Sequence, residues 1–431
     1  MSAGVSIASI RRCTTAWGAL AALGLGMRLW AQAPAAGSAG GWQTSAQVTQ
    51  GLDTNVLLST SNPQASATTH YQFSLGRSWL GPRSRFSATF SPEGQVYAGH
   101  SALNYVAETY EQSWTYAWQH STLSWSSSAE RMPERASQAL GGGIGSAGAA
   151  AASLSLELAT LLTSGTSTLD FMHQYSPRSS WTATATGGLQ VFNRDAQLLA
   201  SLAPGNPLTL LATTSHAHSA GGSLSWSHQM TQRRSVSLSA NASQMWNSHP
   251  AQSLLYSSVK ATVQQQLGAG VSVAVGGGPA WNRTLNPQAR PVSAAGLPAT
   301  GYTASADLTM QHGHQQYGAT WNRSEQVSLI PGGVTTQLLG LQYSVQLGSS
   351  WSASASAGYS QFAGVNASSG GAQPGSTYIA GQISYRIASD WSLQTAFSFN
   401  SQSLLMVGGG SLPLRRAHAS FGLSYQSGGA H

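Results

Sequence analysis

A run of alternating residues in the last quarter of the chain constrains the fold most. Residues 349–362 read Ser-Ser-Trp-Ser-Ala-Ser-Ala-Ser-Ala-Gly-Tyr-Ser-Gln-Phe. One parity carries Trp351 and Tyr359 with alanines between them, whereas the other parity is mostly serine. A period of two residues predicts a β-strand with one apolar and one polar face. Aromatic residues at both ends of an apolar face are typical of a membrane-spanning strand, because aromatic rings favour the two bilayer interfaces.

The composition favours the same interpretation. Charged residues make up 7% of the 431 residues, against roughly 25% in soluble proteins. Hydrophobic residues make up 41%, yet no apolar run approaches the ~18 residues of a membrane helix. The 14 Trp and 14 Tyr argue against a disordered chain. Low charge without long apolar runs indicates a β-barrel, since apolar and polar positions alternate along its strands.

The same alternation recurs down the chain and predicts about eighteen strands. They are expected near 42–50, 69–80, 85–97, 104–119, 121–130, 164–175, 180–192, 216–230, 235–246, 253–267, 271–281, 301–312, 315–328, 337–347, 351–362, 377–387, 391–401 and 415–426. Short and long connections alternate between them. We therefore predict an all-β, transmembrane, antiparallel up-and-down barrel of about eighteen strands, with sixteen as the alternative, short periplasmic turns and long external loops.

The beginning of the sequence resembles a secretory signal. Arg11 and Arg12 precede a short apolar stretch at 16–27, and Ala31-Gln32-Ala33 fits a small-x-small cleavage site. We expect a signal peptide over 1–33, a flexible segment over 34–41, the barrel over 42–426 and a C-terminal tail over 427–431. The expected location is the bacterial outer membrane.

The formal charge of +7 falls to +4 when Arg11, Arg12 and Arg28 leave with the signal peptide. The remaining arginines are scattered, whereas a nucleic-acid interface needs a clustered basic patch, so no nucleic-acid partner is expected. A modestly basic, arginine-dominated chain could attract anionic lipopolysaccharide or anionic solutes. Outer-membrane lipids and lipopolysaccharide are therefore the expected surroundings.

Five charged residues fall on the parity that faces the barrel interior. They are Lys260, Asp307, Arg386, Asp170 and Arg416. Charges that face a lumen tune ion selectivity; the alternative is that they only keep the interior hydrated. The other lining residues are Ser, Thr, Gln, Asn and Gly, which predicts weak contacts with small polar solutes or sugars.

The longest predicted connection contains a Gly- and Ala-rich segment at residues 141–163. It could form an external loop, a short helix, or a constriction or plug inside the lumen, and long loops within one domain are often functional. The residues that mark the possible plug are Gly141, Ile144, Leu154, Glu157 and Thr163.

No motif in the sequence indicates an enzyme or a cofactor. Two histidine pairs, His216 with His218 and His312 with His314, are expected to face one side of a strand, but no cysteine or carboxylate cluster accompanies them, so no metal site is expected. A Gly-x-Ser-x-Gly turn and a phosphate-binding loop are missing from the sequence. An outer-membrane lipid hydrolase would need a Ser–His pair that meets on one outward face. Residues 53–55, Asp-Thr-Asn, match only the start of a calcium loop, and we predict that this stretch lies in a turn.

Three stretches resemble bacterial outer-membrane barrels. Residues 51–56, Gly-Leu-Asp-Thr-Asn-Val, and the turn at 175–180, Tyr-Ser-Pro-Arg-Ser-Ser, are similar to motifs of uncharacterised barrel proteins of the putative barrel porin type, some of them near exopolysaccharide gene clusters. That resemblance implies envelope or polysaccharide transport, with polysaccharide-export components as partners, and it supplies no catalytic residues. The last strand, 415–426, resembles an assembly signal, which implies contact with the barrel-assembly machinery.

The predicted function is a porin-like channel for passive passage of small polar solutes. One alternative is an accessory or structural barrel in polysaccharide export or envelope assembly. Another is an outer-membrane enzyme.

Overall fold

A computed structural model describes nine stretches of the chain: residues 41–56, 63–133, 161–193, 216–247, 252–285, 299–326, 334–364, 375–405 and 411–427. The predicted signal peptide at 1–33 lies outside them, as do residues 141–160 of the predicted plug segment. Within these stretches no helix is long and apolar enough to cross a membrane.

The described residues form eighteen β-strands and one short 3₁₀ helix, η1 (Ser101–Leu103). The strands are β1 (Trp42–Asp53), β2 (Ser66–Leu80), β3 (Ser84–Tyr97), β4 (Tyr105–Ala117), β5 (Ser121–Pro133), β6 (Leu161–Ser176), β7 (Ser179–Asn193), β8 (His216–Thr231), β9 (Arg234–Asn247), β10 (Gln252–Gly268), β11 (Val271–Thr284), β12 (Ala299–His312), β13 (Gln315–Gln326), β14 (Val334–Leu347), β15 (Trp351–Gly364), β16 (Gly375–Arg386), β17 (Trp391–Leu405) and β18 (Ser411–Ser427).

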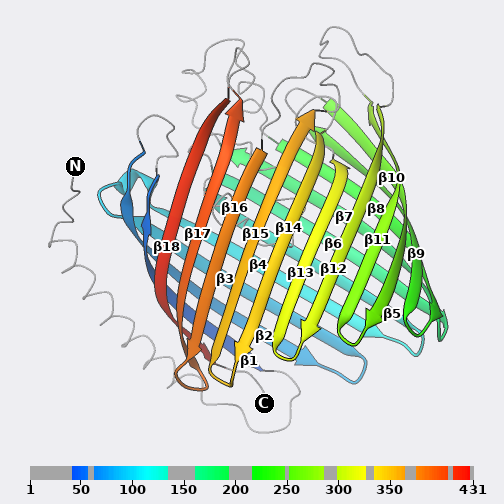
Figure 1. Ribbon diagram of the computed structural model, residues 1–431, viewed down its shortest axis with the longest axis horizontal. Coiled ribbons are helices and arrows are strands. Elements are labelled where there is room, and N and C mark those ends of the chain that lie inside the picture. Colours follow the sequence, from blue (N-terminus) through cyan, green and yellow to red (C-terminus); the bar gives the residue numbers. More distant parts are fainter. Residues whose placement is uncertain are drawn as a thin grey trace.

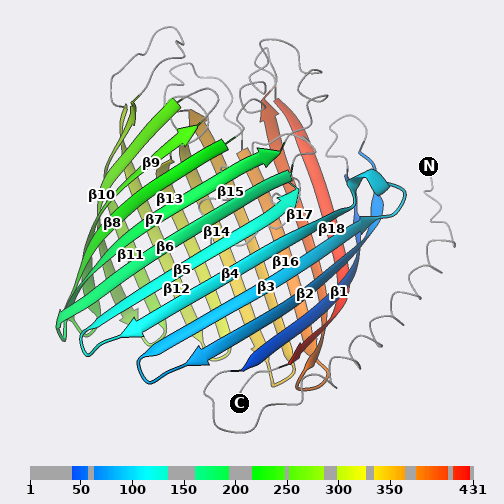
Figure 2. The same ribbon diagram turned by 180° about the vertical axis from the view of Figure 1, so that it is seen from behind.

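The eighteen strands close into one barrel. Every strand pairs antiparallel with the next along the chain, and β18 pairs antiparallel with β1, where Leu423 lies opposite Val48. Figure 1 shows the tilted wall from the side of β12–β18, and Figure 2 shows the opposite wall, with β1 beside β18. The prediction of an eighteen-stranded up-and-down barrel is confirmed.

The two ends of the barrel differ in their connections. Eight connections, from the one between β2 and β3 to the one between β16 and β17, are short hairpin turns, and they all lie at the lower end in Figure 1. Three of these turns place a glycine at positive φ: Gly270 at 81°, Gly313 at 57° and Gly348 at 70°. Side chains with a Cβ rarely adopt this backbone region, so glycine fits these tight turns. We call this end the short-turn end and the other the long-loop end.

The strand faces follow the predicted alternation. Large apolar side chains such as Leu341 and Phe397 lie on the outer surface and are about half exposed (52% and 50%). Aromatic pairs follow this outer surface next to the short turns: Trp351 and Tyr385 have ring centroids 4.5 Å apart, and those of Trp391 and Tyr425 are 4.9 Å apart. An apolar band bordered by aromatic rings is what a bilayer requires of a barrel exterior.

Candidate functional site

The first and last strands are joined at the long-loop end by a buried ion pair. Arg416 on β18 donates from Nε to Oδ2 of Asp53 over 2.8 Å, and its terminal nitrogen contacts the same oxygen. Asp53 is fully buried, and the Arg416 side chain is 17% exposed. The prediction that residues 53–55 lie in a turn is wrong for Asp53, which is the last residue of β1 and pairs with His418; Thr54 and Asn55 follow the strand. Its carboxylate is held inside the wall because the guanidinium and a backbone amide replace the water that it loses.

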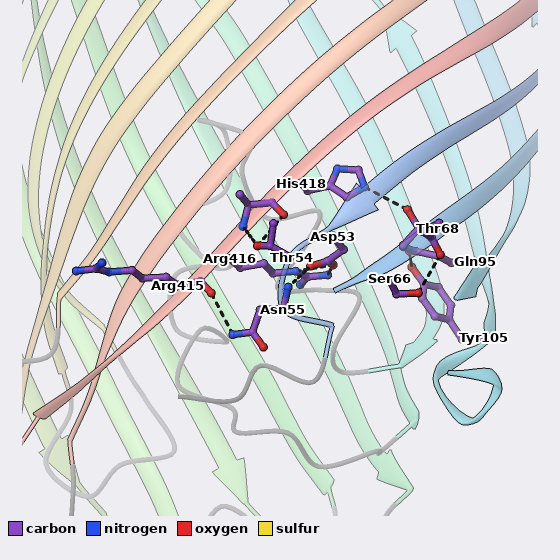
Figure 3. Close-up of polar contacts among 12 residues, drawn as sticks. Asp53, Thr54, Asn55, Ser66, Thr68, Gln95, Tyr105, Arg415, Arg416 and His418 are labelled. Carbon is purple, nitrogen blue, oxygen red and sulfur yellow. Dashed lines mark hydrogen bonds and ion pairs between the residues drawn. The ribbon is translucent and has the colours of Figure 1, made fainter. Parts of the chain in front are cut away.

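The next two residues extend this contact (Figure 3). The backbone nitrogen and the Oγ1 of Thr54 donate to the carbonyl of Ala417 over 3.0 and 3.3 Å, and the nitrogen of Ala417 donates to Thr54 Oγ1 over 2.9 Å. Asn55 donates from its backbone nitrogen to Asp53 Oδ1 and from Nδ2 to the carbonyl of Arg415, each over 3.0 Å. We call the three residues Asp53, Thr54 and Asn55, each of which is hydrogen-bonded to β18, the clasp.

Polar side chains on β2–β4 and β18 continue from the clasp along the inner wall. Thr68 Oγ1 and His418 Nε2 are 3.5 Å apart, and Tyr105 donates its hydroxyl to Gln95 Oε1 over 2.8 Å. Because most of these polar atoms bind one another and Asp53 and Asn55 are 0% and 1% exposed, this end of the seam is sealed. Its contacts stabilise the closed barrel and leave little room for a ligand.

Two of the predicted lumen charges lie on neighbouring parts of the opposite wall. The Cε atom of Lys260 on β10 lies over Gly276 on β11, and Asp307 on β12 pairs with Ala274 on β11 and Thr320 on β13. The structure does not bring Lys260 and Asp307 together: the ion pairs among the described residues are those of Arg416 with Asp53 and of His70 with Glu93.

The remaining predicted lumen charges are also separate. Asp170 on β6 accepts a hydrogen bond from Thr184 Oγ1 over 2.6 Å. Arg386 lies at the short-turn end of β16, where its backbone nitrogen donates to Ser350 over 2.7 Å. Among the five predicted residues, Arg416 alone is held in an ion pair within the described stretches.

The predicted plug segment is described only at its end. Thr163 belongs to β6, where it pairs with Arg131 and Val191. Gly141, Ile144, Leu154 and Glu157 lie outside the described residues.

The short-turn end carries a repeated backbone contact that the sequence analysis missed. A carbonyl in each of the eight short turns accepts a hydrogen bond from a backbone nitrogen of the strand that comes after that hairpin, as when the turn between β6 and β7 accepts from β8. In six of the eight contacts the donor is a glutamine, and the other two donors are Ala117 and Arg386. The six glutamines are Gln174, Gln229, Gln266, Gln311, Gln346 and Gln426.

These six glutamines, which we call the glutamine collar, have the lumen-facing parity. Gln346, for example, directly follows Val345, whose parity is that of the exposed Leu341, so Gln346 has the opposite parity. Four of the six stand two or three residues before a Gly- or Pro-containing turn, as in Gln-Leu-Gly at 346–348. This spacing is visible in the sequence and could have revealed the collar.

The lumen wall is hollowed at two places along the collar. One hollow of about 480 Å³ lies between β12 and β16 and has a neutral polar lining that includes Gln311, Gln346, Gln382 and Ser354. The other, of about 600 Å³, lies between β6 and β10 and adds arginines to the same kind of lining. Unlike the sealed clasp, these two hollows are open.

Two Ser–His contacts occur at the short-turn end on outward parity. Ser121 Oγ lies 2.9 Å from His173 Nδ1, and Ser179 Oγ lies 2.7 Å from His228 Nδ1. Both are directly opposed cross-strand pairs. Within the described stretches the other ring nitrogen of each histidine has no carboxylate partner, so neither contact forms a triad.

The histidine pairs do not come together as a metal site in the described residues. His218 lies opposite Leu189 and Trp246 on the outer face. The expectation that His312 and His314 share one strand face is wrong, because Gly313 turns the chain between them and β12 ends at His312.

Sequence comparisons find no matching family model and no matching curated protein. Among solved structures, the apoprotein form of the FrpB iron transporter from Neisseria meningitidis is similar, with a TM-score of 0.50, 6% identity, and coverage of 89% of this chain and 81% of that chain. The outer membrane protein OpdK of Pseudomonas aeruginosa has a TM-score of 0.44 and 10% identity, over 90% of this chain and 98% of that chain. At such identities the likeness extends to the fold, which is that of the large bacterial outer-membrane barrels.

Proposed function

We propose that the chain is an outer-membrane, porin-like channel for the passive passage of small polar solutes. The observation that carries this proposal is the lumen at the short-turn end, where the glutamine collar and two polar hollows line a closed eighteen-stranded wall. Barrels of sixteen to eighteen strands are wide enough to leave an aqueous channel. Amide and hydroxyl groups exchange hydrogen bonds with a passing solute at little net cost.

Single-channel conductance of the purified protein in planar bilayers tests the proposal. An open channel gives discrete, ohmic current steps that impermeant polymers above a size limit leave unchanged. A variant that lacks residues 141–160 but keeps all eighteen strands tests the predicted plug. The deletion stops before Leu161 because β6 begins there. Absence of current steps from both proteins would contradict the channel.

A second candidate is a lipid acyl hydrolase, since Ser179 and His228 meet on the outward face. It is the weaker candidate because a serine nucleophile needs an oriented base, and no carboxylate of the described residues orients His228. Release of fatty acid from phospholipid vesicles, lost in Ser179→Ala and kept in Ser121→Ala, would support it. No release from the wild type would exclude this candidate.

A further inference from the structure

The larger hollow differs from the other in its charge. Arg178, Arg233 and Arg234 are among the residues that line it, and none of its described lining residues is acidic. The neutral hollow between β12 and β16 has no arginine and no lysine in its lining. The two hollows lie at the same end of the same lumen, so their contrast isolates the effect of the arginines.

The backbone places two of these arginines in equivalent positions. The carbonyl of Arg178, in the turn between β6 and β7, accepts from Gln229 over 2.8 Å, and that of Arg233, in the turn between β8 and β9, accepts from Gln266 over 2.7 Å. Each turn is therefore fixed to the strand beyond its own hairpin, β8 for the first and β10 for the second. The two arginines are held on successive turns of one rim, beside the inward glutamines that line the same hollow.

The guanidinium groups of Arg178 and Arg233 are free to bind a ligand. Both residues are exposed, and among the described residues neither side chain has a hydrogen bond or an ion pair. Arg234 is different, because its Nε donates to Gln265 Oε1 over 2.7 Å. Guanidinium groups match the oxygens of phosphate and carboxylate groups and bind them through charge-assisted hydrogen bonds.

Neutral donors complete the hollow. Ser180, Ser227 and Gln229 line it on the lumen-facing parity, and the Oγ atoms of the two serines are 2.9 Å apart. Hydroxyl and amide groups can donate to an anion's remaining oxygens without adding a competing negative charge. The lining thus combines two unpaired cations with uncharged donors.

We propose that this hollow binds a multivalent oxyanion, that is, a solute with several phosphate or carboxylate oxygens, at the short-turn mouth of the lumen. The inference deepens the proposed function, because it gives the channel a retention site for anions where the lumen opens. Anions held by Arg178 and Arg233 are enriched at the entrance, since opposite charges raise the local concentration of a solute.

Isothermal titration calorimetry with inorganic pyrophosphate tests the proposal on the full barrel in detergent. The measurement does not depend on conduction, so its failure is distinguishable from failure of the channel proposal. We expect saturable binding by the wild type. In the double variant Arg178→Gln/Arg233→Gln the affinity should fall at least about tenfold, which corresponds to ~1.4 kcal/mol. No saturable binding by the wild type would overturn the site.

The matched control is Arg83→Gln/Arg85→Gln. The carbonyl of Arg83, in the turn between β2 and β3, also accepts a backbone hydrogen bond, here from Ala117 on β4, yet neither Arg83 nor Arg85 lines the hollow. This control removes the same charge from the same rim and should keep the wild-type affinity. An equal loss in both double variants would overturn the hollow as the site and assign the effect to overall charge.

A comparison of lipid environments separates a soluble anion from a lipid headgroup. Most strand residues of the hollow have lumen-facing parity, so pyrophosphate should bind equally well in nanodiscs of phosphatidylcholine and in nanodiscs that contain phosphatidylglycerol. Competition by phosphatidylglycerol would overturn the assignment to a solute in the lumen.

Discussion

Arg416, on the last strand of the barrel, donates from Nε to Oδ2 of Asp53, on the first strand, over 2.8 Å. The two residues are separated by 363 positions in the sequence, so their contact exists only when the barrel is closed. Asp53 is fully buried. A buried carboxylate of this kind is held by its partner, and the clasp is therefore a fixed part of the seam rather than a ligand site.

Replacement of Arg416 by methionine should destabilise the barrel through this contact. The variant leaves the buried carboxylate of Asp53 without its cation, and the loss of one partner of a buried ion pair costs about 3–5 kcal/mol. Urea-induced unfolding of the barrel in lipid, followed by Trp fluorescence, measures the loss. The control Arg386→Met removes an exposed arginine from the lumen and should cost much less. Equal losses would contradict a special role for the seam.

Any side chain at position 51 should destabilise the barrel next to the clasp. A Cβ at this position would lie 2.8 Å from His418 Nε2 and 2.8 Å from the carbonyl oxygen of Ala419. Gly51→Ala should therefore displace His418 or the β1–β18 ladder and cost about 1–3 kcal/mol, as overpacking usually does. The measurement is the shift in the midpoint of denaturant unfolding. Gly187→Ala is the matched control, because a Cβ there meets nothing within 4 Å. A harmless Gly51→Ala would show that the seam adapts.

Lys260 should favour anions in the lumen. Its side chain lies over Gly276 and has no ion pair among the described residues, so in the proposed channel its charge would act on passing ions. The interaction energy of two unit charges about 4 Å apart in water is about 1 kcal/mol, and salt weakens it further. Lys260→Gln should therefore lower the anion-to-cation permeability ratio about twofold. Reversal potentials in a KCl gradient measure the ratio. Asp307→Asn should raise the ratio, and a change of the same sign in both variants would contradict the lumen assignment.

The sequence predicted the barrel well because every strand repeats the same signal. In β15, Ala355 and Ser354 differ in polarity as the two faces require, and this alternation is independent of the partner strand. All eighteen strands appear within a few residues of their predicted ranges. The short turns were equally legible, because Gly270, Gly313 and Gly348 mark places where the chain reverses.

The contacts between distant residues could not be predicted in this way. The alternation of polar and apolar residues predicts that Arg416 faces inward. The register that brings Arg416 to Asp53, however, arises from closure of the whole barrel. The turn prediction for Asp53 failed for this reason. The glutamine collar is an intermediate case: its spacing before the turns is visible, but the contact of each turn with the next strand depends on the tilt and stagger of the barrel.

Adjacent residues of β15 give a direct test of which face meets lipid. Ala355 has the parity of the outward-facing Trp351 and Tyr359, whereas Ser354 lines the neutral hollow inside the lumen. An arginine on the lipid face of a barrel costs about 2–4 kcal/mol at the bilayer midplane, whereas lumen positions accept charge readily. Ala355→Arg should therefore lower the free energy of unfolding in lipid vesicles by about 2–4 kcal/mol, and Ser354→Arg should leave it nearly unchanged.

The same two variants should separate in conductance. Ser354→Arg adds a cation to the wall of the neutral hollow and should raise the anion-to-cation permeability ratio, because in the proposed channel the new charge would face the permeating ions. The arginine of Ala355→Arg should point away from the lumen, so the variant, where it folds, should keep the wild-type anion-to-cation permeability ratio. A destabilised Ser354→Arg together with a stable Ala355→Arg would reverse the assignment of the two faces, and with it the placement of both hollows inside the channel.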